Sequence, residues 1–148
     1  MSLIKSLESA APGTTVVLES LLDALPFNDQ GLVAAIAQQH DTGEVLMLGW
    51  MNETALRATI ASGEATYFSR RRQQLWRKGE TSGQTQKVIG LRLDCDGDAL
   101  LVLIDQHGAA CHTGRRSCFY LQIDNNTVVV RDAPLIDPAL LYQSRSLS

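Results

Sequence analysis

At 148 residues the chain is long enough for a single domain with one sizeable core, and its 45% hydrophobic content is ordinary for a folded protein. A formal net charge of −3 argues against general nucleic-acid binding, which usually needs a basic surface. The sequence shows neither a signal-peptide core nor an apolar run long enough to cross a membrane, so we expect a cytoplasmic protein without a membrane partner.

The pattern of apolar residues predicts a fold that is rich in strands. In chain order, the predicted elements are a helix at 16–25, strands at 32–38 and 44–50, a helix at 53–62, a strand at 65–69, a polar loop at 70–83, a loosely alternating stretch at 87–93, a strand at 99–104 and a hairpin of 119–123 with 128–131. Asn52 is a plausible N-cap of the second helix and Gly63 a plausible stop. The continuous apolar run 99–104 is typical of a strand that is buried on both faces.

These elements indicate a mainly β (α+β) class, with one compact β-rich domain and one or two helices. We divide the chain into an N-terminal arm with a helix (1–30), a central domain (31–131) and a C-terminal tail (132–148). The tail carries two prolines and is expected to be irregular or docked on a partner.

The cysteines are the first candidate site, because three thiols cannot all pair within one chain and metal binding is the better interpretation. They are Cys95, Cys111 and Cys118. Thiolates favour zinc, and three protein ligands leave a position for water, as in catalytic sites. Buried inert thiols, or a closed site with His107 or His112 as fourth ligand, remain alternatives. In an extended chain His112 points away from its neighbour Cys111, which suits a nearby acid or base better than a ligand.

Three carboxylates surround the first cysteine and suggest a second, harder metal site. They are Asp94, Asp96 and Asp98. Alternation places them on one side of an extended chain, and a bend at Gly97 would let them converge on Mg²⁺. An EF-hand loop is rejected because Ala99 stands where its glycine is needed. A solvated turn of aspartates is the alternative.

A cationic loop is the third candidate, with five cations between Arg70 and Lys78. Guanidinium groups, a lysine and glycine-flanked backbone amides together favour phosphate binding, whereas a merely solvated charged loop is the alternative.

Four motifs in this order resemble phosphoribosyl-AMP cyclohydrolase. They are Tyr67-Phe68-Ser69-Arg70, the run Leu75-Trp76-Arg77-Lys78-Gly79-Glu80-Thr81-Ser82-Gly83, Asp94-Cys95-Asp96-Gly97-Asp98, and Cys111-His112-Thr113 followed by Ser117-Cys118-Phe119. The resemblance implies hydrolytic opening of the N1–C6 bond of the adenine ring of phosphoribosyl-AMP by zinc-activated water, a step of histidine biosynthesis.

The resemblance also implies the cofactors and the assembly. The three cysteines would hold Zn²⁺, the three aspartates Mg²⁺, and an intertwined homodimer would bring Cys95 of one subunit to Cys111 and Cys118 of the other. His112 would move protons between water and N1. Candidate contacts to the substrate are Arg70, Arg72, Trp76, Lys78, Thr81 and Ser82, although Trp76 could equally be a core residue. Rival interpretations are a non-catalytic, zinc-stabilised nucleotide-binding module and a zinc deaminase, and the signature of a zinc deaminase is missing.

Overall fold

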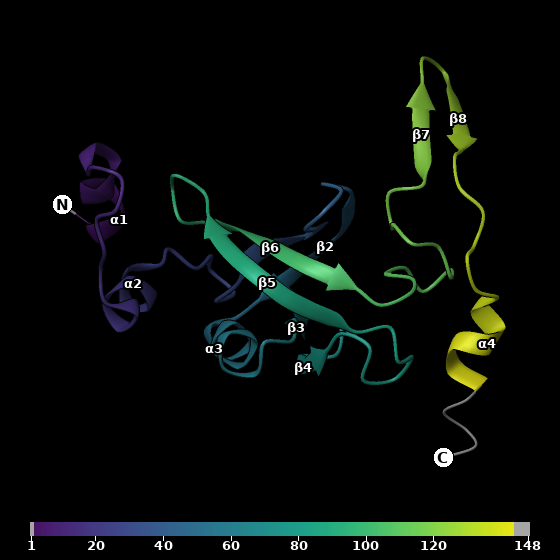
Figure 1. Ribbon diagram of the computed structural model, residues 1–148, viewed down its shortest axis with the longest axis horizontal. Helices are drawn as coiled ribbons and strands as arrows, with labels where there is room; N and C mark the ends of the chain where they lie inside the picture. The colour runs from purple at the N-terminus through teal and green to yellow at the C-terminus, as the bar shows by residue number, and fades with distance from the viewer. Residues whose placement is uncertain (1, 144–148) are drawn as a thin grey trace.

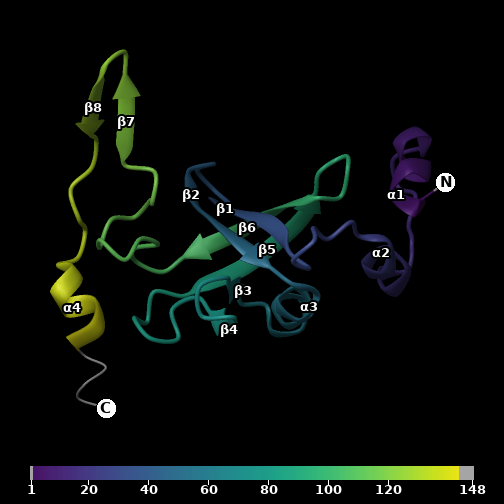
Figure 2. The same cartoon turned by 180° about the vertical axis from the view of Figure 1, so that it is seen from behind.

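A four-stranded sheet forms the centre of the computed structural model, which describes residues 2–143 (Figures 1 and 2). Its strands, in the order β2-β1-β6-β5, are Val45–Met51, Val33–Gln39, Ala99–Gln106 and Gln86–Leu93. The central pair β1 and β6 is parallel, and both outer pairs are antiparallel. With few and short helices around these strands, the predicted α+β class is confirmed.

Helix α3 (Glu53–Ser62) follows directly from its local sequence signals. The Asn52 side chain accepts a hydrogen bond from the amide of Ala55 at 2.8 Å, and Gly63 ends the helix with a φ of 75°. Both predictions are confirmed. Buried Ala55 and Leu56 of this helix join the main apolar core, so α3 packs on the sheet through one face.

Strand β6 differs slightly from the expected strand with two buried faces. Its residues alternate between buried and half-buried, so that Leu100, Val102 and Ile104 enter the core while the other face is only partly covered. The helix predicted at 16–25 is present as α2 (Leu18–Ala24), and it contributes Leu22 to the same core.

The prediction of a continuous loop at 70–83 was wrong for residues 74–77. Strand β4 (Gln74–Arg77) pairs antiparallel with β3 (Thr66–Ser69), and the ring of Trp76 lies 5.4 Å from that of Tyr67. The turn between them places Gln73 at a φ of 54°. The many cations of this stretch indicated a loop, and the turn gave no signal of its own. A left-handed turn is usually marked by glycine, whereas here the backbone of Gln73 adopts it.

Both ends of the described chain hold short elements outside the sheet. Helix α1 (Leu3–Ser6) and a 3-10 turn (Leu7–Ser9) precede α2. The hairpin β7 (Leu121–Asp124) with β8 (Thr127–Val130) was predicted, and it projects away from the sheet in Figure 1. The expectation of an irregular tail was wrong for α4 (Pro138–Gln143), where Asp137 caps the amide of Ala139 at 2.9 Å. Residues 1 and 144–148 of the predicted arm and tail lie outside the described residues.

Within residues 2–143, no helix combines the length and apolarity that a bilayer crossing needs.

Candidate active site

The sequence-predicted metal ligands lie beyond opposite ends of β6. The aspartates and Cys95 form the exposed turn that leads into this strand, and Cys111 and Cys118 lie in the loop that follows it. The strand has eight residues, and a rise of ~3.3 Å per residue makes it roughly 25 Å long. One chain therefore keeps Cys95 apart from the other cysteines. Among residues 2–143, no three His, Cys, Asp or Glu side chains gather so that they could share one ion.

Cys111 and Cys118 do lie together. Their loop is held to β2, because the amide of Cys118 donates to the carbonyl of Leu46 at 2.7 Å. The hydroxyl of Thr113 donates to Cys111 Sγ at 3.0 Å. Burial, together with the neighbouring Cys111 thiol, raises the pKa of Cys118 to about 12. Two neighbouring sulfurs suit a cation such as zinc, which would replace their protons.

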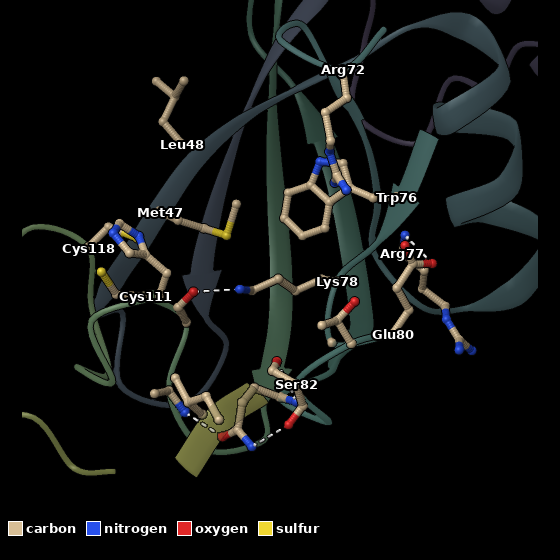
Figure 3. A pocket seen from close by; sticks show the side chains of 17 residues that line it. Met47, Leu48, Arg72, Trp76, Arg77, Lys78, Glu80, Ser82, Cys111 and Cys118 are labelled. Carbon is tan, nitrogen blue, oxygen red and sulfur yellow. Dashed lines mark hydrogen bonds between the residues drawn. The ribbon is translucent and has the colours of Figure 1, made fainter. Parts of the chain in front are cut away.

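A cavity of about 450 Å³ opens beside this thiol pair (Figure 3). One wall is β4 with the segment that follows it, and the other is the loop that begins at Ala109. The predicted site residues that line the cavity are Arg72, Trp76, Lys78, Thr81, Ser82, Cys111, His112 and Cys118. The chain thus brings the predicted base, two thiols and most of the predicted phosphate contacts around one space.

Arg70 is the predicted substrate contact that lies outside this cavity. Its guanidinium lies 4.8 Å from the ring centre of Trp50, in a neighbouring depression that Trp76 also lines. Stacking of a guanidinium on an indole accounts for this position without a substrate.

Lys78 spans the cavity between its two walls. Its ammonium donates to the carbonyl of Ala110 and lies 5.6 Å from the ring centre of Trp76 (Figure 3). Burial lowers the pKa of Lys78, and the nearby thiols of Cys118 and Cys111 oppose that shift. The amine of Lys78 therefore lies beside the thiol pair as well as in the cavity.

Gln84 is a second bridge between the walls, and sequence reasoning missed it. Its Oε1 accepts a hydrogen bond from the amide of Ala109 at 2.9 Å, and its Nε2 donates to the carbonyl of Ser82 at 3.2 Å. A Cβ at Gly108 would overlap Gln84 Oε1, so a larger residue there would displace the Gln84 side chain from this position. Glutamine carries no motif for catalysis or metal binding, and nothing in the local sequence singles it out.

A buried chain of hydrogen bonds joins β3, β5 and β6 beside the cavity. The hydroxyl of Tyr67 donates to Gln86 Oε1 at 2.7 Å, and Gln86 Nε2 donates to Gln106 Oε1 at 2.9 Å. Gln106 in turn donates to backbone carbonyls on both sides, including that of His107 at 3.0 Å. Desolvated amides that are fully paired in this way hold the segment after β4 and the loop after β6 in one arrangement.

The acidic turn has the bend that the sequence suggested. Gly97 has a φ of 75°, and Asp94 Oδ1 accepts from the amide of Asp98 at 3.1 Å. The neighbouring Asp94 raises the pKa of Asp98, first through a hydrogen bond and then through its charge. Exposed carboxylates that repel each other suit a hard cation, which would relieve the repulsion.

Comparison with known proteins identifies the family of this chain. The family model described as Phosphoribosyl-AMP cyclohydrolase matches residues 47–120, half of the chain. A phosphoribosyl-AMP cyclohydrolase of Alkalilimnicola ehrlichii is 59% identical over 140 residues, which cover 95% of this chain and 99% of the relative. That of Granulibacter bethesdensis is 64% identical over 128 residues, covering 86% of this chain and 100% of the relative. That of Alcanivorax borkumensis is 58% identical, with 95% and 99% covered.

The matched residues contain the thiol pair, the acidic turn, His112 and both bridging residues of the cavity. The chain belongs to the phosphoribosyl-AMP cyclohydrolase family.

Proposed function

We propose that this protein opens the adenine ring of phosphoribosyl-AMP by hydrolysis of the N1–C6 bond, in histidine biosynthesis. The observation that carries the proposal is the cavity in which His112 and two thiols face Lys78 and the cationic loop, in a chain of this family. The metal-ligating thiols also suit a reducing, cytoplasmic compartment.

The residues present fit a zinc site that two subunits share. Cys111 and Cys118 supply two sulfurs at the cavity, and the third cysteine, Cys95, is exposed at the far end of β6. A partner's acidic turn placed at the cavity would complete a three-thiolate set and leave one position open. When bound there, zinc would supply an acidified water molecule.

The same arrangement would bring the carboxylates to the substrate. Asp94, Asp96 and Asp98 flank Cys95 and are all exposed, so they would arrive at the cavity with it. A Mg²⁺ ion held by these oxygens would face the phosphates of the nucleotide. Lys78 and Arg72 would add positive charge from the wall opposite the thiol loop. By binding the phosphates, they would orient the purine.

The projecting hairpin supports such a dimer. Leu121 pairs with Val130, and Ile123 pairs with Val128, so the four side chains lie on one side of the ribbon. We call these four residues the hairpin face. They are 58–79% exposed, and a contiguous apolar surface of this kind favours contact with another protein. A second copy of the chain is the partner we propose.

His112 would manage the protons of the reaction. As water oxygen bonds to C6 and the N1–C6 bond breaks, one water proton ends on N1 and the other on the exocyclic nitrogen, giving a carboxamide. His112 is exposed in the cavity next to Cys111, within the reach of a general acid and base. Thr81 and Ser82 offer hydroxyl donors to phosphate on the opposite wall.

Ring opening tests the activity directly, because it changes the ultraviolet absorbance of phosphoribosyl-AMP. The purified protein should convert this substrate with zinc bound. Binding without an absorbance change would identify a non-catalytic nucleotide-binding module instead.

Mixing two inactive variants tests the shared site. Cys95→Ser and Cys111→Ser should each lose zinc and activity as homodimers. In a mixed dimer, one site carries both substitutions and the other keeps all of its cysteines, so about half of the activity per mixed dimer should return. If each site were built within one chain, both sites of the mixed dimer would stay defective and no activity would return.

A further inference from the structure

The C-terminal segment that follows the projecting hairpin returns to the thiol loop. The carbonyl of Gly114 accepts hydrogen bonds from the amides of Leu135 at 2.9 Å and Ile136 at 3.3 Å. The guanidinium of Arg115 donates to the carbonyl of Asp132 at 2.6 Å. Both anchoring residues lie between Cys111 and Cys118, so the segment is attached to the loop that forms one wall of the cavity.

Gly114 permits this attachment because it lacks a side chain. Its φ is 82°, and a Cβ built there would overlap the carbonyl oxygen of Ile136. The residue is buried, although its two chain neighbours are partly exposed. Close approach of the C-terminal segment therefore explains this glycine.

Helix α4 continues from the anchor to the cavity. Leu141 is 3% exposed and lines the cavity together with Lys78, Cys111 and His112. The yellow ribbon of α4 runs along the edge of the cavity in Figure 3. Its neighbour Leu140 is 55% exposed, so the helix turns one leucine inward and the other to solvent. The segment lies outside the matched residues 47–120.

We infer that Leu141 is a substrate-positioning residue, held over the cavity by the anchor at Gly114. The inference rests on the proposed function, because the ligand is taken to be the nucleotide. Arg72, Lys78 and the hydroxyl residues of the cavity suit phosphate and ribose, whereas a purine needs apolar contact, which Leu141 offers together with Met47, Leu48 and Trp76. Leu141 supplies such contact and would restrict the positions of the base beside His112 and the thiols.

Steady-state kinetics with phosphoribosyl-AMP on full-length variants test this role. Leu141→Ala should raise KM about tenfold with little change in kcat, as expected when an apolar contact to bound substrate is lost. Leu141→Met, which keeps the volume, should stay within about twofold of wild type. Leu140→Ala, one residue away and exposed, is the matched control and should leave KM unchanged.

The shift in KM separates positioning from a structural role. A variant that is only partly folded lowers apparent kcat and keeps KM, because the folded molecules bind normally. If Leu141→Ala is too unstable to assay, Leu141→Val replaces it, and KM should then rise as the side chain shrinks. A KM that does not depend on the side chain at position 141 would overturn the inference.

A double-mutant cycle tests the anchor. Gly114→Ala should displace the C-terminal segment and raise KM by itself, and adding Leu141→Ala should then raise KM little further. Independent, multiplicative effects would overturn the link between Gly114 and Leu141. A wild-type protein that leaves phosphoribosyl-AMP intact would contradict the proposed function instead, and calorimetric titration with AMP would then test Leu141: unchanged affinity in Leu141→Ala overturns its role.

Discussion

The ammonium of Lys78 donates a hydrogen bond of 2.5 Å to the carbonyl of Ala110, the residue before Cys111. This bond joins the cationic wall of the cavity to the loop that carries the thiols and His112. Lys78→Met keeps most of the aliphatic stem but leaves the carbonyl without its charged donor, a loss of about 1.5–3 kcal/mol. We expect kcat/KM to fall by roughly 10- to 100-fold, because displacement of the thiol loop relative to the cationic wall would misplace the reacting groups.

Lys87→Met is the control for the lysine variant. Lys87 is exposed on β5 and does not line the cavity, so its loss should leave kcat/KM near the wild-type value. Equal activities of the two variants would contradict a special role for the bond to Ala110.

His112→Ala tests the proton-transfer role. The imidazole lines the cavity beside the thiol pair. Removal of a general acid and base usually lowers kcat by roughly 10²–10⁴-fold, and we expect a loss in this range. Zinc content, measured on the purified variant, should not change because His112 is not among the proposed ligands. The comparison variant is His107→Ala, at an exposed turn outside the cavity. Loss of zinc together with activity would instead favour the closed site with a histidine ligand.

Ile123→Asp tests the hairpin face. Ile123 is 79% exposed in the single chain, so a carboxylate there costs the isolated subunit little, but burial of the charge in a dimer is strongly unfavourable. The solution mass should fall to that of one subunit, and zinc should be lost with it because the shared site would be broken. Gln122→Asp adds the same charge on the opposite side of the ribbon, where Gln122 pairs with Val129, and should leave the mass unchanged.

Local signals predicted the parts of the fold that depend on few neighbours. Asn52 and Gly63 mark the ends of α3 correctly because a cap bonds within its own turn. Strand β4 was missed because its pairing depends on the left-handed Gln73 and on contact between Trp76 and Tyr67, neither of which gives a local pattern.

In the candidate site, too, only the residues with a local signal could be predicted. His112 and the cysteines could be named because their chemistry is specific and close in sequence, and the structure places Cys111 and His112 at one cavity. Gln84 and Leu141 could not be named, since an ordinary amide and an ordinary leucine acquire a role only when tertiary contacts bring them to the same space.

Tyr67→Phe tests the buried chain of hydrogen bonds through its dependence on pH. Tyr67 is fully buried, and burial raises the pKa of its hydroxyl far above the ordinary 10.0. Below pH 10 both folded and unfolded states hold the proton, so the bond to Gln86 contributes in full. The variant leaves Gln86 Oε1 without its donor and should be less stable by about 1–3 kcal/mol at pH 8.

Above pH 10, ionisation of Tyr67 in the unfolded state alters the difference in stability between the wild type and Tyr67→Phe. As pH rises above 10, the unfolded state can release the proton of Tyr67 and the folded state cannot. Wild-type stability should therefore fall, by up to ~1.4 kcal/mol per pH unit from this group, until the folded pKa is passed. Tyr67→Phe lacks this titration. Denaturant unfolding of both proteins at one concentration should thus show a gap that is constant from pH 7 to 9 and narrows by pH 11. A gap that widens in alkali would mean that the folded state ionises more readily than the unfolded chain, contrary to the burial of this hydroxyl.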